Sequence, residues 1–174
     1  QVDNYNRALS LISPESRYCL LVQADDWIMP ECVQRMVELA ETDSRIGVVT
    51  SYHIEGREPC GGPLDPGISV LEGPYVCRET LLGKLAVFAS PTTVMYRSEI
   101  IRAHQPFFDR SRHHEDTDAL FRTLRDWKLG FVHQLLSFVR VDNASITWAV
   151  RNFDPFALDA FLRSRLYLEQ KERD

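Results

Sequence analysis

A buried strand pattern that ends in two adjacent carboxylates constrains this chain more than any other feature. Residues 17–23, RYCLLVQ, have the continuous apolar character of a strand covered on both faces. Asp25 and Asp26 follow almost directly, and residues 30–42, which begin with a proline, repeat their apolar side chains at helical spacing. The order of strand, acidic turn and helix predicts that both carboxylates lie just beyond the carboxyl end of a strand.

The rest of the chain continues to alternate between strand and helix patterns. Strands are expected at 46–54, 92–97 and 131–141, and helices at 3–12, 75–85, 98–104, 114–130 and 154–169. Ser98 is expected to cap the helix that it opens, and Gly130 to end the helix before it. Residues 55–67 are rich in glycine and proline and predict an irregular loop.

This alternation predicts an α/β protein with a mixed sheet flanked by helices. Residues 1–150 are expected to form one domain, and residues 151–174 a C-terminal amphipathic helix packed on it.

Composition and charge exclude several classes of protein. The 174 residues are enough for one domain with a real core. The net charge of −5 and the lack of a Lys/Arg stripe argue against nucleic-acid binding. No stretch approaches the roughly 20 apolar residues that cross a bilayer, and no secretory signal opens the chain, so a soluble protein is expected.

The four cysteines are far apart and lack paired C-x-x-C spacing: Cys19, Cys32, Cys60 and Cys77. This spacing favours reduced thiols in a cytosolic protein over a zinc knuckle or a disulfide framework.

Two acidic clusters carry the candidate chemistry. Asp25 and Asp26 repel each other, so they need water, a helix start or a cation beside them. Ligands of open α/β sheets bind beyond the carboxyl ends of strands, and Mg²⁺ or Mn²⁺ is typically held there by one or two carboxylates and substrate phosphates. The other interpretation is that the pair only favours the start of the next helix, and the same holds for Glu115 and Asp116.

Several motifs recur in an order that resembles the family 2 glycosyltransferases of the GT-A fold. The motifs are ADDWIMP at 24–30, SPTTVMYRSEII at 90–101, FFDRSRHHEDTDALFRTLRDWKLGFV at 107–132 and VRVDNASIT at 139–147. The resemblance implies a GT-A-like mixed sheet and inverting transfer of a hexose from a nucleotide-diphospho-sugar to the hydroxyl of a carbohydrate or lipid-linked acceptor.

In that family a D-x-D type turn holds a divalent metal, Mn²⁺ or Mg²⁺, against the two phosphates of the donor. QADD at 23–26 is the matching stretch, which assigns the metal to Asp25 with Asp26 as support. Gln23 stands where the first acid usually stands; it can hydrogen-bond a ribose or a phosphate but brings no charge.

The family's later E-D pair, at the acceptor side, resembles HHEDTD. By this resemblance Asp116 is the general base that removes the proton of the acceptor hydroxyl, with Glu115 as its neighbour. No enzyme nucleophile is required, and the metal stabilises the negative charge that grows on the departing diphosphate.

A third family motif, similar to R-x-H-x-x-S-x-T, supplies a histidine to the metal or the phosphates. Asp142 replaces that histidine here, and as an acid it is a further candidate metal ligand. Arg140 and Ser145 are candidate phosphate or loop contacts, or else ordinary surface pairs.

The SPTT turn resembles the segment that lies under the sugar in the family, which implies that Thr92 and Thr93 lie near the donor. Alternatively they are β-branched strand residues selected for packing, the interpretation that their residue type favours. Trp27 is a candidate for stacking on a sugar or for the core, whereas Trp127, at helical spacing from Leu124, is expected in the core.

The family usually opens with further strands that hold the base and the ribose, and none of them is found here. The resemblance therefore implies the metal- and acceptor-binding half of such an enzyme, in polysaccharide or glycoconjugate synthesis on the cytoplasmic side of a membrane. The alternative is a catalytically degenerate binding or scaffold domain. A phosphotransferase ranks last, because CGGP at 60–63 lacks the helix and lysine of a phosphate-binding loop.

Overall fold

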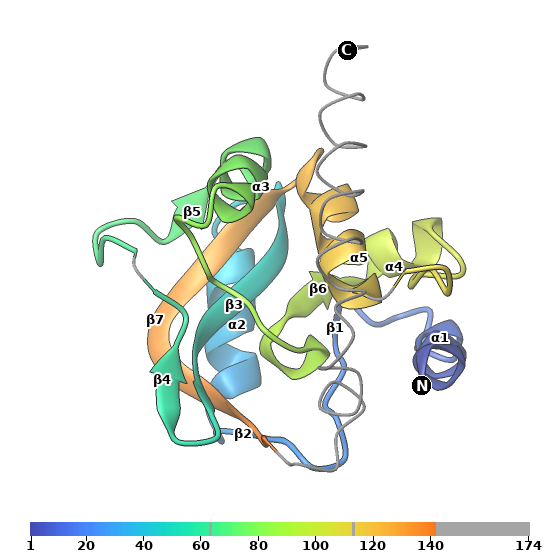
Figure 1. Cartoon of the computed structure of the whole chain (residues 1–174). Coiled ribbons are helices and arrows are strands. Elements are labelled where there is room, and N and C mark those ends of the chain that lie inside the picture. The colour runs from blue at the N-terminus through green and yellow to red at the C-terminus, as the bar shows by residue number, and fades with distance from the viewer. Residues whose placement is uncertain (63, 113, 142–174) are drawn as a thin grey trace.

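In the computed structural model, the alternating strands and helices form a mixed β-sheet with helices on both faces (Figure 1). The structure describes residues 1–62, 64–112 and 114–141. The expected helix at 154–169, and with it the C-terminal unit 151–174, lies outside the described residues.

The helices are α1 Val2–Ser10, α2 Cys32–Ala40, α3 Gly73–Leu81, α4 Ser98–Ala103 and α5 Glu115–Leu124, with a 3₁₀ turn η1 at Pro91–Thr93. The strands are β1 Tyr18–Leu20, β2 Trp27–Ile28, β3 Ile46–Glu55, β4 Glu58–Cys60, β5 Val70–Leu71, β6 Met95–Arg97 and β7 Lys128–Val139. No helix of the described ranges is long and apolar enough to cross a membrane.

The two long strands β3 and β7 form the centre of the sheet, whose order is β1-β6-β3-β7-β2. They pair in parallel from Ile46 opposite Lys128 to Glu55 opposite Val139, with irregular register around Tyr52. All other pairings are antiparallel: β6 on β3, β1 on β6, β2 and β5 on β7, and β4 folded back on the end of β3. A mixed sheet flanked by helices, as the sequence predicted, is confirmed.

The core has two parts, one on each face of this sheet (Figure 1). On one face α2 buries Met36 and Ala40 completely against β3 and β7. On the other face α5 buries Leu120 and Leu124 in a larger cluster, and Trp127 packs against it as expected. Helical spacing thus identified the buried face of α5 and predicted Met36 and Ala40 of α2 correctly, but Val33, on the same expected apolar stripe, is 47% exposed.

Gly73 fixes how closely α3 approaches the chain that follows α5. A Cβ atom at Gly73 would lie 1.9 Å from the carbonyl oxygen of Leu124 and 2.1 Å from that of Trp127. Only glycine fits such close backbone contacts, so this position sets the separation of the two segments.

Four local expectations are wrong. The strand expected at 17–23 ends at Leu20, and the one expected at 92–97 begins at Met95, because Pro91 opens a 3₁₀ turn. Ser98 is the first residue of α4, and its side chain does not cap that helix. Gly130 lies inside β7, where α5 has already ended.

The segment expected to be an irregular loop, residues 55–67, begins with a short hairpin. Strand β4 pairs with the end of β3, and Gly56 makes the turn with φ +64°, a conformation that glycine adopts without strain.

Candidate active site

The acidic pair lies in a turn between β1 and the short strand β2. The N–H of Asp26 donates to the carbonyl of Gln23 at 3.1 Å and closes the turn. Asp25 is exposed, while Asp26 is half-buried. The two carboxylates therefore point into different surroundings although they are adjacent in sequence.

Asp26 is held by two segments that are distant in sequence. Its Oδ2 accepts hydrogen bonds from the hydroxyls of Thr92 at 2.5 Å and Ser90 at 3.5 Å. Its Oδ1 accepts a bond from the backbone N–H of Arg140 at 2.9 Å. Charge-assisted bonds of this kind are among the stronger hydrogen bonds in proteins, so they fix the orientation of this carboxylate.

Thr92 and Thr93 lie in the 3₁₀ turn, so the expectation that they are strand residues is wrong. Both are completely buried. The hydroxyl of Thr93 donates to the carbonyl of Ser90 at 2.9 Å and stabilises the turn itself. The hydroxyl of Thr92 instead bridges the Asp26 carboxylate and the N–H of Gln23, which donates to it at 3.1 Å.

Gln23 also takes part in this arrangement through its side chain. Its Nε2 donates to the hydroxyl of Tyr5 on α1 at 2.5 Å. Gln23 therefore connects the acidic turn to α1, a role that a carboxylate at this position could fill only by accepting from the phenol.

Asp25 makes no side-chain hydrogen bond or ion pair with the residues that the structure describes. The exposed carboxylate of Asp25, next to the fixed carboxylate of Asp26, is a suitable ligand for a cation, because its oxygen lone pairs are accessible from solvent. The donor atoms of Asp25 and Asp26 are all oxygens, and this set fits Mg²⁺ or Mn²⁺ better than a softer metal.

Trp27 is not a core residue. Its ring stacks on Phe138 of β7 with centroids 3.9 Å apart and planes 3° apart, and 53% of the residue stays exposed. It presents an aromatic surface to solvent next to Asp26.

The second acidic cluster opens α5, where Glu115, Asp116 and Asp118 occupy the first turn. Oδ1 of Asp116 accepts the N–H of Thr117 at 2.6 Å. Asp116 and Ser90 line the same small cavity. Because Ser90 also contacts Asp26, the η1 turn lies between the two acidic clusters.

The charge of Asp116 also affects the pKa of the buried phenol of Tyr96 in β6. Burial raises the pKa of Tyr96, and the charge of Asp116 raises it further. Tyr96 is 7% exposed and lines the same cavity, so this side of Asp116 faces a largely apolar environment.

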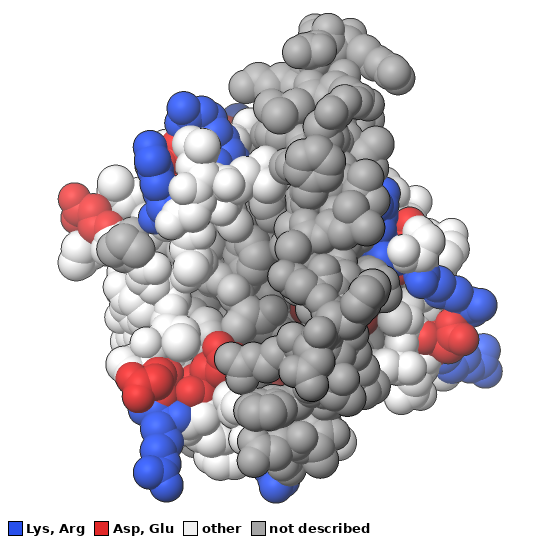
Figure 2. All heavy atoms as spheres, in the orientation of Figure 1, with Lys and Arg blue, Asp and Glu red and all other residues white. Residues whose placement is uncertain are grey.

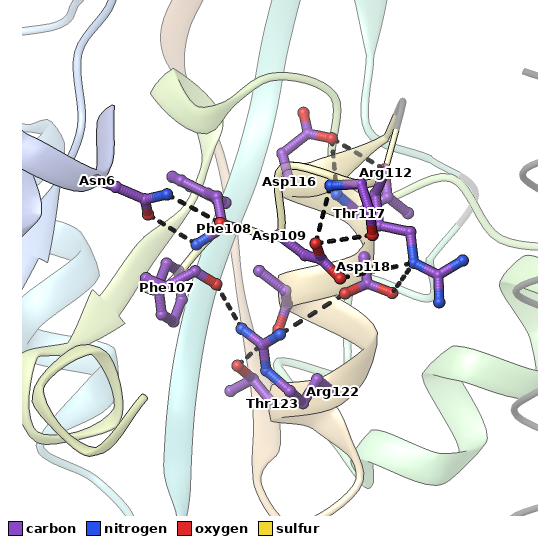
Figure 3. A network of polar contacts seen from close by, with 12 residues as sticks. Asn6, Phe107, Phe108, Asp109, Arg112, Asp116, Thr117, Asp118, Arg122 and Thr123 are labelled. Atoms are coloured by element: carbon purple, nitrogen blue, oxygen red, sulfur yellow. Dashed lines mark hydrogen bonds and ion pairs between the residues drawn. The ribbon is translucent and has the colours of Figure 1, made fainter. Parts of the chain in front are cut away.

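A polar network fixes the loop that leads into α5 (Figure 3). Asn6 of α1 donates to the carbonyl of Phe108 and accepts its N–H, both at 2.8 Å. Arg122 of α5 donates to the carbonyl of Phe107 at 2.5 Å and pairs with Asp118 at 3.6 Å. The position of Asp116 thus depends on α1 as well as on its own helix.

The sequence interpretation missed these supporting residues, and for Asn6 a signal was present. Asn6 is 8% exposed and lies three residues before the buried Leu9, at helical spacing. A polar side chain on the buried face of an amphipathic helix needs partners in the protein. Ser90 and Phe138 carry no such signal.

Of the residues singled out from the sequence, the structure brings Gln23, Asp26, Thr92 and the backbone of Arg140 into direct contact. Asp142 and Ser145 lie outside the described residues.

No family model and no curated protein matches this sequence. Solved structures of S. aureus TarS are similar in fold. TarS 1–349 has a TM-score of 0.60 at 15% identity, over 79% of this chain and 39% of that one. Its complex with UDP-GlcNAc has a TM-score of 0.61 at 15% identity, over 80% of this chain and 38% of that one. Its complex with UDP has a TM-score of 0.57 at 16% identity, over 79% and 39%.

The described chain therefore shares the fold of part of TarS and spans about two fifths of the length of TarS 1–349. At this identity the likeness establishes the fold alone.

Proposed function

We propose that this protein takes part in glycosyl transfer from a nucleotide-diphospho-sugar to an acceptor hydroxyl, with inversion at the anomeric carbon. The fold is shared with TarS, a glycosyltransferase of which complexes with UDP-GlcNAc and UDP are solved. The observation that carries the proposal is the convergence on Asp26 of the η1 turn and the end of β7. Three motifs of the family resemblance meet at this carboxylate.

On the donor side, Asp25 would hold a divalent cation, with Asp26 as a second ligand and Asp142 as a candidate third. The fixed orientation of Asp26 supports this, since the bond from Arg140 leaves Oδ1 a lone pair, whereas Oδ2 already accepts from Thr92 and Ser90. When bound, Mn²⁺ or Mg²⁺ supplies positive charge beside the diphosphate leaving group.

On the acceptor side, Asp116 would take the proton from the acceptor hydroxyl as that oxygen attacks the anomeric carbon. The bond from the anomeric carbon to the diphosphate oxygen breaks in the same step, and the nucleoside diphosphate leaves. Glu115 would orient the hydroxyl or Asp116 itself. The apolar wall around Tyr96 keeps bulk water from one side of Asp116.

The remaining candidates would contact the substrates. Thr92 and Thr93 lie in the turn between the two acidic clusters, where a donor sugar would be placed. Trp27 offers an exposed ring for stacking on a sugar or a base. Gln23, Arg140 and Ser145 would contact ribose or phosphates.

The acceptor would be a carbohydrate or a lipid-linked saccharide in polysaccharide or glycoconjugate synthesis. The cytoplasmic face of a membrane is the site of action that the family resemblance favours.

The decisive experiment is calorimetric titration of the full-length protein with UDP-GlcNAc, in the presence and absence of Mn²⁺. Asp25→Asn is compared with Asp126→Asn, which removes an exposed carboxylate in the turn before β7. We expect binding that depends on Mn²⁺, is lost in Asp25→Asn and is unchanged in Asp126→Asn.

Binding of UDP-GlcNAc that depends on neither Mn²⁺ nor Asp25 would contradict the metal assignment. If neither UDP-GlcNAc nor other nucleotide-sugars bind, the chain is a binding or scaffold domain that has kept only the fold.

A further inference from the structure

The hairpin of β3 and β4 brings together three side chains of the kinds that bind metals. His53 and Cys60 are paired residues across the two strands, and Glu55 follows His53 by two positions along β3. One ligand atom from each of the three lies within 4.8 Å of the others. In the sequence these residues have no zinc-finger spacing, and only the strand pairing assembles them.

His53 is buried, and its ring has no hydrogen-bond partner within the part of the chain that the structure describes. The residue is 2% exposed, and neither Nδ1 nor Nε2 has a partner among the described residues. A buried imidazole normally has at least one of its nitrogens satisfied, since an unsatisfied buried polar group costs about 1–3 kcal/mol. A ligand on one ring nitrogen would remove this cost.

The charges around the hairpin also favour a cation. Glu55 and Glu58 are directly opposite each other at the end of the ladder, an arrangement that is unfavourable for like charges. Figure 2 shows acidic side chains gathered at the lower left, with a basic side chain directly beside them. A bound cation would offset the repulsion between these two carboxylates.

We propose that His53, Glu55 and Cys60 bind a zinc ion through one nitrogen, one oxygen and one sulfur, with water in the fourth position. Zinc accepts mixed nitrogen, oxygen and sulfur ligands, whereas Mg²⁺ and Mn²⁺ prefer oxygen alone. Bonds of about 2.0–2.3 Å place the ligand atoms of a tetrahedral site roughly 3.3–3.8 Å apart. The present ligand atoms lie within 4.8 Å of one another, so a shift of at most about 1.5 Å brings them to these separations. The Cys60 thiol releases its proton to solvent when it binds.

This site differs from the proposed donor site, but backbone hydrogen bonds at the end of β7 connect the two. The N–H of Gly56, at the tip of the hairpin, donates to the carbonyl of Val139 at 2.9 Å. The next residue, Arg140, donates the N–H that holds Asp26. Zinc on the hairpin would stabilise the end of β7 from which this hydrogen bond is made.

Cobalt substitution tests the site in the full-length protein, because a thiolate bound to Co²⁺ gives a charge-transfer band in the near ultraviolet that oxygen ligands do not give. Zinc content after dialysis and competition with a chromophoric chelator give the stoichiometry and the affinity. The variants are Cys60→Ser and Glu55→Gln. The matched controls are Cys19→Ser, another partly buried thiol, and Glu58→Gln, on the same hairpin.

We expect one zinc per chain, a cobalt thiolate band that is absent in Cys60→Ser, and affinity lowered at least about tenfold in Glu55→Gln. Cys19→Ser should bind like the unmodified protein. Glu58→Gln should weaken binding less than Glu55→Gln, because its carboxylate supplies charge near the ion but no ligand atom. Asp25→Asn should keep the band, which separates this site from the donor site and from the outcome of any transferase assay.

The proposal is overturned if the protein shows no thiolate band, or if the band survives in Cys60→Ser. It is also overturned if Cys19→Ser abolishes the band. Glu55 is exposed, so its substitution tests the site even if Cys60→Ser alters the folding of the hairpin.

Discussion

The hydroxyl of Thr92 lies 2.5 Å from Oδ2 of Asp26 and donates a hydrogen bond to it. The two residues are 66 positions apart in sequence, and Thr92 is completely buried. This bond joins the acidic turn to the η1 turn and therefore orients the carboxylate on which the proposed donor site depends.

The contribution of this bond can be measured with a double-mutant cycle. Thr92→Val removes the hydroxyl at nearly constant shape, and Asp26→Asn removes the charge. We expect a coupling free energy of about 1–2 kcal/mol between the two changes, by urea denaturation. Thr93→Val, in the same turn, is the control, because its hydroxyl donates to Ser90. The changes in the free energy of unfolding caused by Thr93→Val and Asp26→Asn should be additive to within about 0.5 kcal/mol.

The proposed general base predicts a specific kinetic defect. Asp116→Asn keeps the shape of the side chain but cannot take a proton, so we expect kcat to fall by about 10²–10⁴-fold with little change in donor affinity. Glu115→Gln should have a smaller effect. Initial rates with UDP-GlcNAc and an acceptor, together with donor calorimetry, would separate the two quantities. A loss of donor affinity equal to the loss of rate would contradict the role of Asp116 as a base.

The buried amide of Asn6 should be important for stability. Asn6→Ala leaves both backbone groups of Phe108 without their partner, and we expect a loss of about 2–3 kcal/mol in the free energy of unfolding. Asn4→Ala, on the exposed side of the same helix, should change it by less than about 0.5 kcal/mol. Equal effects of the two substitutions would show that the Asn6 contacts do not hold the loop before α5.

The pH dependence of stability should report on Asp43, which follows α2. The backbone N–H of Arg45 and the ammonium of Lys128 lower the pKa of the Asp43 carboxyl below its ordinary value of 3.8. A group whose pKa is lowered by folding contributes stability above its ordinary pKa, and this contribution is lost as the pH falls through the lowered value. We therefore expect Asp43→Asn to have a lower Tm than the unmodified protein at neutral pH.

The difference in Tm should shrink as the pH falls below about 4. Asp126→Asn should leave the Tm unchanged at neutral pH. A difference for Asp43→Asn that persists at pH 2 would assign it to packing rather than to charge.

Local patterns were enough to predict the class of the fold. Helical spacing identified the buried side of α5 and most of that of α2, and the strand pattern at 46–54 identified β3, because there the local pattern and the tertiary environment agree. The patterns failed at the ends of helices and strands and at turns. Gly130 was predicted to end a helix but lies within β7. A Cβ atom at this position would lie 3.1 Å from the side chain of Leu39.

The candidate site was only partly predictable for a similar reason. Asp25 and Asp26 could be placed after a strand from local sequence, but their different surroundings follow from contacts with Thr92 and Arg140. His53 and Cys60 meet only because β4 folds back on β3, in a segment rich in glycine and proline that predicted no strand. The metal-binding role of Asp25 and the catalytic role of Asp116 stay predictions.

The central position of β7 has a consequence for how the chain folds during synthesis. It is the last described strand, yet it pairs with β2, β3 and β5. Until residue 139 has left the ribosome, one long edge of β3 has no partner and Asp26 lacks the N–H of Arg140. During this interval the unpaired apolar edge of β3 can pair with other chains and aggregate. A ribosome-associated chaperone would therefore have its greatest effect then.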